Sequence, residues 1–101
     1  HAETEYIKVA PHNPNGPVAC AASVQLCAAI PNFLILETAR DMPWHDKVQK
    51  TPLKIKDGYF ELPTTPGLGI DLDETVIKSR PFEPHTYRGS WDERDGAVAD
   101  V

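Results

Sequence analysis

Two side chains in the first half of the chain, His12 and Glu37, have the types and positions that acid–base chemistry needs. His12 lies in the proline-rich segment VAPHNPNGPV, and Glu37 directly follows four consecutive apolar residues. A histidine takes or gives a proton near neutral pH, and a carboxyl group can hydrogen-bond to charge that develops on a substrate oxygen. The spacing alone also fits an ordinary loop histidine and a solvated glutamate at the end of a strand.

The residues around this pair have the pattern of a βαβ unit. Residues 5–10, EYIKVA, alternate as a strand does. Gly16-Pro17 suits the start of a helix, because proline at the first helical position gives up no helical hydrogen bond, and the apolar run 17–30 predicts that helix. Residues 33–38, FLILET, predict a strand that is buried on both faces, which is typical of parallel sheets covered by helices.

In a βαβ unit the two strands are parallel, so His12 would lie just past the end of one strand and Glu37 at the end of the other. Functional sites of α/β barrels and open parallel sheets lie at the carboxyl ends of the strands. A lone βαβ unit cannot cover a strand as apolar as residues 33–38 on both sides. We therefore expect it to need neighbouring elements that this sequence does not contain.

Three further side chains, Asn13, Trp44 and His45, are candidates for substrate binding. Asn13 follows the candidate histidine directly, and Trp44 and His45 lie in the polar stretch 39–51, which predicts a loop. The alternatives are a turn-forming Asn13 whose side chain bonds to nearby backbone, and a His45 that is simply an exposed loop residue.

Size and charge restrict the class of function. A chain of 101 residues allows one modest hydrophobic core. Its 10 basic and 15 acidic residues give a net charge of −5 without a basic cluster, which argues against nucleic acid or a membrane as a partner. The apolar run 18–30 is too short to span a bilayer, and the first residues lack the pattern of a secretory signal, so we expect a cytoplasmic protein.

The two cysteines, Cys20 and Cys27, are expected to be buried free thiols. Seven residues of helix separate their Cα atoms by roughly 10 Å, which is too far for a disulfide. A zinc site built from them with His12 and His45 would need cysteine pairs at short spacing. The sequence therefore predicts no metal site within this chain.

The second half of the chain predicts a hairpin followed by a crossing loop. Residues 52–63 alternate on both sides of Asp57-Gly58, a strong signal for a type I′ turn, which needs positive φ at both central positions. Residues 66–71, PGLGID, lack the lysine of a phosphate-binding loop and predict a close approach of two backbone segments.

After this loop, Asp71 or Asp73 is expected to cap a short helix that starts near Glu74. The stretch from Arg80 onward shows no period and predicts an extended tail.

The segment APHNPNGPVACAASVQLCAAIPNFLILE, followed by PTTPGLGIDLDE, resembles the C-terminal part of the mandelate racemase/muconate lactonizing enzyme group of the enolase superfamily. It is most similar to the galactonate dehydratase-like acid-sugar dehydratases. The histidine, the Gly-Pro, the helix of small residues and the final glutamate recur in that order and spacing. The resemblance extends through the ending YRGSWDERDGAVADV.

For the fold, the resemblance implies an α/β protein that contributes the C-terminal portion of a (β/α)7β barrel. Residues 5–11 would be strand 7, residues 17–30 helix 7 and residues 33–38 strand 8. Residues 1–50 would then end the catalytic barrel, and the hairpin and tail of residues 51–101 would return to an α+β capping domain. A homo-oligomer is expected.

For the chemistry, the resemblance implies enzymes that bind Mg²⁺ through three carboxylates on earlier strands and remove the proton α to a substrate carboxylate. The resulting enediolate is stabilised on the metal, and loss of a β-hydroxyl gives a 2-keto-3-deoxy sugar acid. His12 matches the acid/base histidine that pairs with an aspartate on strand six. Glu37 matches the glutamate that hydrogen-bonds to the enediolate.

The metal ligands and the partner aspartate would lie before His1, so we expect the chain alone to be inactive and to need the remainder of the barrel and capping domain. Its other partner would be a small-molecule sugar acid. The alternatives are a racemase or lactonizing enzyme of the same superfamily, a truncated family member that serves assembly, and a non-enzymatic βαβ-hairpin module that binds through Trp44, Trp91 and the acidic tail.

Overall fold

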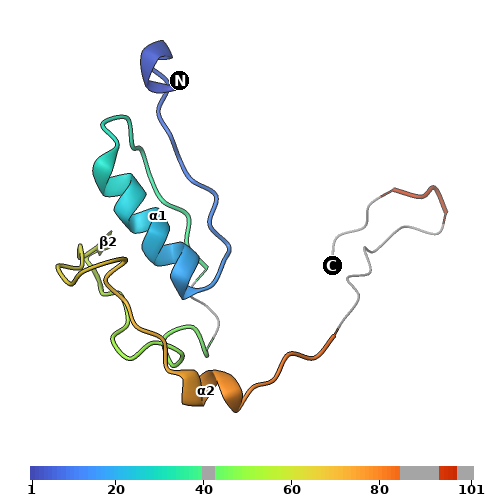
Figure 1. The fold of residues 1–101 in the computed structure, drawn as a ribbon. Helices are drawn as coiled ribbons and strands as arrows, with labels where there is room; N and C mark the ends of the chain where they lie inside the picture. The colour runs from blue at the N-terminus through green and yellow to red at the C-terminus, as the bar shows by residue number, and fades with distance from the viewer. Residues whose placement is uncertain (40–42, 85–93, 98–101) are drawn as a thin grey trace.

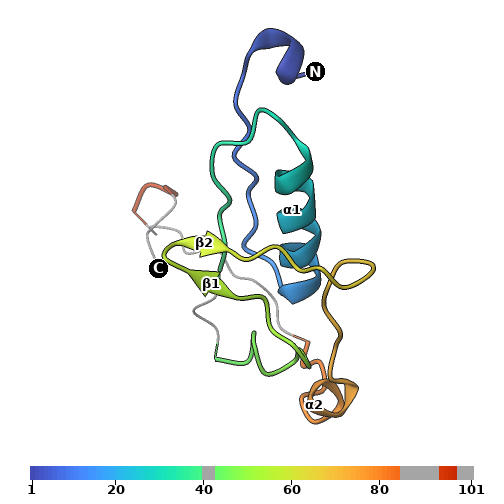
Figure 2. The same ribbon diagram turned by 90° about the vertical axis from the view of Figure 1, so that its left-hand side faces the viewer.

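The computed structural model describes residues 1–39, 43–84 and 94–97. One helix forms the centre of the molecule, with two extended segments along one side of it and a small hairpin packed nearby (Figures 1 and 2). The elements, in chain order, are the 3-10 helix η1 (Glu3–Glu5), helix α1 (Pro17–Ala29), strands β1 (Ile55–Lys56) and β2 (Tyr59–Phe60), and helix α2 (Glu74–Lys78).

The two extended segments that flank α1 in the sequence lie side by side and run in the same direction, as the βαβ pattern predicts (Figure 2). Val9 and Phe33 form a parallel bridge, in which the Val9 N–H donates to the Asn32 carbonyl at 2.8 Å and the Leu34 N–H to the Val9 carbonyl at 2.9 Å. Further along, the Glu37 N–H donates to the Pro11 carbonyl at 3.3 Å. The parallel arrangement is therefore confirmed.

The predicted strand over residues 5–10 is wrong at its start. Glu5 ends η1, and Tyr6 adopts a left-handed conformation with φ of 57°. The pairing of the two segments is also confined to a single bridge rather than continuous strands. Two segments without neighbours form only a marginal ladder, because neither side chains nor further strands hold their outer edges.

Helix α1 confirms the predicted helix and ends one residue earlier than predicted, at Ala29. Gly16 is its N-cap and Pro17 occupies the first turn. The helix buries one stripe, spaced three or four residues apart, and this stripe contains Pro17, Cys20, Ala21, Val24 and Cys27. Its small side chains allow close packing against other segments, and the buried cluster contains Cys20, Ala21, Val24 and Leu53. Both cysteines are free and buried, as predicted.

The apolar run before Glu37 is not buried on both faces within this chain, as expected for a βαβ unit without its neighbouring elements. Leu34 is 57% and Ile35 63% exposed, and only Leu36 packs against the core. Helix α1 covers one side of the parallel pair, and nothing among the described residues covers the other side.

Strands β1 and β2 form the predicted hairpin, with Ile55 opposite Phe60 and Lys56 opposite Tyr59. Both turn residues have positive φ, 52° at Asp57 and 82° at Gly58, so the Asp-Gly signal is confirmed.

In the loop PGLGID the close approach is between the backbone of Gly69 and the side chain of Pro63, and the predicted crossing of two backbone segments stays a prediction. A Cβ atom on Gly69 would lie 2.3 Å from Cβ of Pro63, which no real pair of atoms tolerates. Only a glycine therefore fits at this position.

The loop after Glu37 is more ordered than its polar sequence predicts. Gln49 and Leu72 form an antiparallel bridge, and the Lys50 N–H and Asp73 N–H donate to the carbonyls of Asp71 and Val48, each at 2.9 Å. This pairing holds the start of α2 against residues 48–50. Asp73 caps α2 by accepting hydrogen bonds from the N–H groups of Thr75 and Val76, which confirms one of the two predicted caps.

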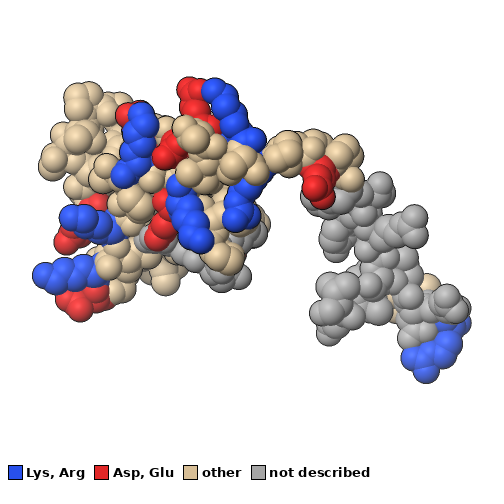
Figure 3. Space-filling view, turned by 90° about the horizontal axis from the view of Figure 1, so that it is seen from below, with Lys and Arg blue, Asp and Glu red and all other residues tan. Residues whose placement is uncertain are grey.

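Beyond α2 the chain extends away from the rest of the molecule through exposed residues 81–84 (Figure 1). Trp91, the residue assigned to partner binding in the non-enzymatic alternative, lies outside the described residues. On the face shown in Figure 3, lysine and arginine side chains are interspersed with aspartate and glutamate. Among the described residues, no helix has the length and apolar character required to cross a membrane.

Candidate functional site

His12 and Glu37 are in contact, Nδ1 of the imidazole against Oε2 of the carboxylate. The parallel pair positions them, because it brings the carboxyl ends of the two extended segments to the same edge. Both side chains face solvent, with 80% of His12 and 51% of Glu37 exposed. The site is therefore an accessible histidine–carboxylate pair.

The contact restricts the proton arrangement of the imidazole. A carboxylate oxygen only accepts, so Nδ1 carries the hydrogen that it donates to Glu37. In the neutral imidazole the lone pair then lies on Nε2. Nε2 is consequently the nitrogen of His12 that can accept a proton from a bound molecule.

A main-chain hydrogen bond holds the same carboxylate oxygen. The Asn13 N–H donates to Oε2 of Glu37 at 3.1 Å. Together with the bond from the Glu37 N–H to the Pro11 carbonyl, this contact joins the loop after one segment to the end of the other. Sequence reasoning missed this role, since it considered only the Asn13 side chain.

The Asn13 side chain is 1% exposed, and neither Nδ2 nor Oδ1 has a hydrogen-bond partner within the described chain. It therefore lacks the bonds to nearby backbone that the turn-forming alternative requires. Its burial also keeps the amide away from solvent, whereas its neighbour His12 is open.

Trp44 and His45 form a separate cluster. Their rings lie 6.3 Å apart between centroids and are tilted by 32°. His45 is 3% exposed, so it is not the exposed loop histidine of the alternative reading. Its Nδ1 lies 3.4 Å from Oδ1 of Asp46, and its carbonyl accepts from Nε2 of Gln49 at 3.1 Å. Among the described residues, no hydrogen bond joins this cluster to His12 or Glu37.

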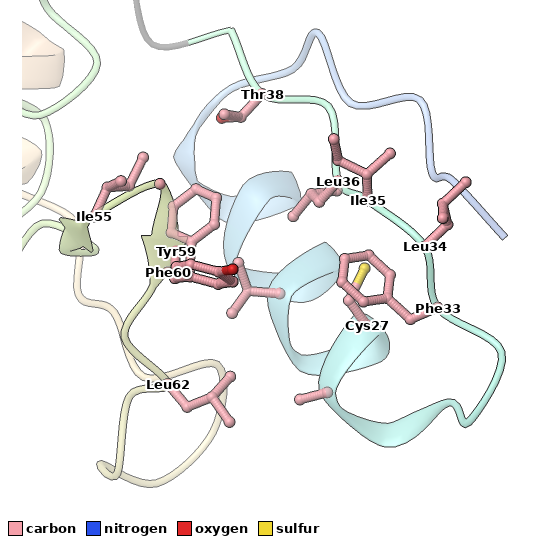
Figure 4. Close-up of a pocket in the computed structure, with 13 residues that line it drawn as sticks. Cys27, Phe33, Leu34, Ile35, Leu36, Thr38, Ile55, Tyr59, Phe60 and Leu62 are labelled. Atoms are coloured by element: carbon pink, nitrogen blue, oxygen red, sulfur yellow. The ribbon is translucent and has the colours of Figure 1, made fainter.

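A cavity of about 510 Å³ lies between α1, the hairpin and the apolar run, and its lining is almost wholly apolar (Figure 4). Its polar side groups are those of Cys27, Thr38 and Tyr59. Burial raises the pKa of the Cys27 thiol by desolvation, which keeps the sulfur in its unreactive protonated form. None of the residues that line this cavity is an aspartate, glutamate, lysine, arginine or histidine.

The residues that the structure describes include no group of three or more histidine, cysteine, aspartate or glutamate side chains placed to hold a metal ion. His12 and Glu37 alone do not make up the oxygen-rich set that Mg²⁺ prefers. A magnesium ion therefore does not fit the described residues by themselves.

Among proteins of assigned function, the chain is 40% identical over 87 residues to the D-xylonate dehydratase of Haloferax volcanii, covering 84% of this chain and 21% of that protein. It is 35% identical over 101 residues to a D-galactonate dehydratase family member of Streptomyces bingchenggensis, covering 98% of this chain and 24% of that protein. The chain thus spans about a fifth to a quarter of the length of these relatives.

Solved structures show the same relationship. A mandelate racemase/muconate lactonizing enzyme from Sulfitobacter sp. superposes with a TM-score of 0.76 at 36% identity, over 84% of this chain and 21% of that one. A protein of Burkholderia xenovorans, assigned as an L-alanine-DL-glutamate epimerase and solved with magnesium and fumarate, gives 0.73 at 33% identity, over 79% of this chain and 20% of that one.

The family described as enolase C-terminal domain-like matches residues 1–76, which include α1, the His12–Glu37 pair and the hairpin. The match covers well over half of the chain, and it agrees with the dehydratase relatives and with the solved structures. The chain belongs to the enolase C-terminal domain-like family.

Proposed function

We propose that the full-length protein that carries this chain is an acid-sugar dehydratase, which removes water from a sugar acid to give a 2-keto-3-deoxy acid. One observation carries the proposal: an accessible histidine and an accessible carboxylate meet at the carboxyl ends of a parallel pair. Relatives named D-xylonate dehydratase and D-galactonate dehydratase family member support the same chemistry.

In this reaction a base takes the proton α to the substrate carboxylate, and the electron pair of the broken C–H bond is left on the substrate as an enediolate. The C–O bond at the β carbon then breaks, and the hydroxyl group leaves with a proton from a general acid as water. The enol that remains takes up a proton at the β carbon, gives up its O–H proton and becomes the keto acid. The reaction needs no oxidant or reductant, because the substrate supplies every atom of the water that is lost.

His12 would move a proton between its Nε2 atom and the substrate, because the Nδ1 atom is engaged by Glu37. A positioned acid or base of this kind contributes about 10²- to 10⁴-fold to a rate. The side chain of His12 is 80% exposed, so a bound molecule can reach the imidazole.

With a proton on its carboxyl group, Glu37 would donate a hydrogen bond to the oxygen on which negative charge develops. Its Oε2 atom accepts from Asn13 and contacts His12, so Oε1 is the oxygen available for this contact. A donor aimed at developing charge stabilises the transition state more than the bound substrate.

We further propose that residues 1–50 end the catalytic barrel and residues 51–101 return to the capping domain. Residues outside this chain would then supply the rest of both domains and the partner aspartate of His12. A magnesium site would likewise use ligands from outside this chain, in line with the solved relative that contains magnesium. Within this chain, His12 and Glu37 are the residues assigned to the steps above.

The test is a screen of purified full-length protein, supplied with Mg²⁺, against D-xylonate, D-galactonate and D-gluconate for 2-keto-3-deoxy products. We expect product from at least one acid sugar and none from the His12→Asn variant. Absence of dehydration for all three with a correctly folded protein, or equal product from the variant, overturns the proposal.

A racemase or epimerase is the second candidate, favoured by the solved relative assigned as an epimerase. It shares the removal of the α proton but keeps the β-hydroxyl group. Proton NMR in D₂O separates the two: a racemase incorporates deuterium at the α carbon without forming a keto acid.

A further inference from the structure

Two consecutive residues reach one oxygen of Glu37. The imidazole of His12 contacts Oε2, and the Asn13 N–H donates to the same atom at 3.1 Å. The loop has few donors to offer, because Pro11, Pro14 and Pro17 carry no N–H. The N–H of Asn13 is directed to a side chain 24 residues away rather than to the loop itself.

The side chain of Asn13 fixes the position of this N–H. It is 1% exposed and enclosed by the chain, while the neighbouring His12 is 80% exposed. Its amide atoms have no hydrogen-bond partner among the described residues, so within this part of the protein packing holds the side chain. A side chain held in this way restricts the backbone conformation at its own position.

An N–H group has a second effect on a carboxyl group, because it can only donate. The oxygen that receives it must present a lone pair, so a proton on Glu37 has to reside on the other oxygen. The bond from Asn13 therefore distinguishes the two oxygens: Oε2 accepts, and Oε1 is left to carry a proton toward a bound molecule.

We propose that Asn13 is a positioning residue that acts through Glu37. Its main-chain N–H fixes Oε2 as the acceptor and reserves Oε1 as the donor to the developing oxyanion. The inference rests on the proposed function for the role of Glu37, while the contact itself stands on the geometry.

The kinetic test is a double-mutant cycle in the full-length protein with Asn13→Ala and Glu37→Ala. Removing the Asn13 side chain loosens the N–H, so we expect kcat and the rate of α-proton exchange each to fall about tenfold, with KM within about twofold. In the Glu37→Ala background nothing remains to be positioned, and the same change should alter the rate of α-proton exchange by less than about twofold. Equal losses in both backgrounds would show a general structural role and overturn the inference.

Asn15→Ala is the matched control, since Asn15 is an exposed asparagine in the same loop. We expect its kcat and KM to stay within about twofold of the parent. A loss equal to that of Asn13→Ala would mean that any disturbance of the loop suffices, which contradicts the proposal.

A second measurement does not depend on turnover or on the folding of the Asn13 variant. In ¹H–¹⁵N NMR spectra of the full-length protein, the amide proton of Asn13 should move upfield in Glu37→Ala, because its carboxylate acceptor is gone. It should not move in Asn15→Ala. If the Asn13 amide proton shifts in Glu37→Ala but the parent protein dehydrates no acid sugar, the contact between Asn13 and Glu37 is supported and the proposed function is wrong. If the parent protein dehydrates an acid sugar but the amide proton does not shift, the proposed function is supported and the role of Asn13 is wrong.

Discussion

Nδ1 of His12 contacts Oε2 of Glu37 although the whole of α1 separates the two residues in the sequence. Both side chains are largely exposed, so their attraction stabilises the fold by at most about 1 kcal/mol. The pair does not bring the segments together. The parallel hydrogen bonds at Val9 and Pro11 do so, and they leave the pair available for chemistry.

The variant His12→Asn should lose activity without losing stability. It removes the imidazole that would exchange the α proton, so exchange of the substrate α proton with D₂O should slow by at least about 100-fold. The free energy of unfolding should change by less than about 1 kcal/mol, because the side chain is exposed. Proton NMR and urea unfolding of the full-length protein measure the two quantities. Retained exchange contradicts the role of His12.

The variant Glu37→Gln should lower kcat more than it raises KM. The contact with the substrate oxygen strengthens as charge develops, so removing the carboxyl group should reduce kcat by roughly 100-fold while KM changes by a few-fold. Glu61→Gln, at an exposed glutamate directly after β2, is the control. If KM alone rises, Glu37 serves substrate binding rather than the chemical step.

The sequence predicted the elements whose signals are local. Gly16 and Pro17 marked the start of α1, and Asp57-Gly58 marked the hairpin, because each signal is a backbone requirement of a few residues. The meeting of His12 and Glu37 was also predictable, since a helix that joins two parallel segments brings their carboxyl ends to one edge.

What the sequence did not predict depends on contacts between distant segments. His45 is buried in a loop that is ordered by pairing between residues 48–50 and 71–73, and nothing in either stretch alone indicates this pairing. The bond from the Asn13 N–H is a main-chain contact, which residue type does not reveal. Leu34 is exposed because no described residues pack on the side of the parallel pair that faces away from α1.

Two glycines of the PGLGID loop should respond differently to alanine. Gly67 and Gly69 have similar φ values of 73° and 80°, so each pays the same conformational penalty of about 1 kcal/mol. Only Gly69 adds a clash, because its Cβ atom would lie 2.3 Å from Cβ of Pro63. Gly69→Ala should therefore lower the free energy of unfolding by about 1–3 kcal/mol more than Gly67→Ala in urea titrations. Equal losses would show that Pro63 moves aside freely.

The Cys27 thiol should react slowly in the folded protein. The free energy of unfolding should fall at high pH. Burial raises its pKa above the ordinary value of 9.0, so the unfolded chain loses the thiol proton first as the pH rises. Between the thiol pKa of the unfolded chain and the higher thiol pKa of the folded protein, the folded protein binds more protons than the unfolded chain. Its free energy of unfolding therefore decreases as the pH rises through that range and not below it. Iodoacetamide labelling should be at least about tenfold slower in the folded protein than in urea. Stability that falls equally above pH 9.0 in Cys27→Ser would exclude this thiol as the cause.

The N-cap of α2 should depend on one carboxylate. Oδ1 of Asp73 accepts from the Thr75 N–H at 3.0 Å and the Val76 N–H at 3.2 Å, which satisfies two donors that the helix leaves open. Asp73→Ala should cost about 1 kcal/mol locally and speed hydrogen exchange at those two amides by about fivefold. Asp71→Ala is the matched control, because within the described part of the chain the Asp71 side chain forms an exposed ion pair of 3.5 Å with Lys50. Faster exchange at Thr75 and Val76 in both variants would show that the 71–73 pairing, rather than the cap, holds α2.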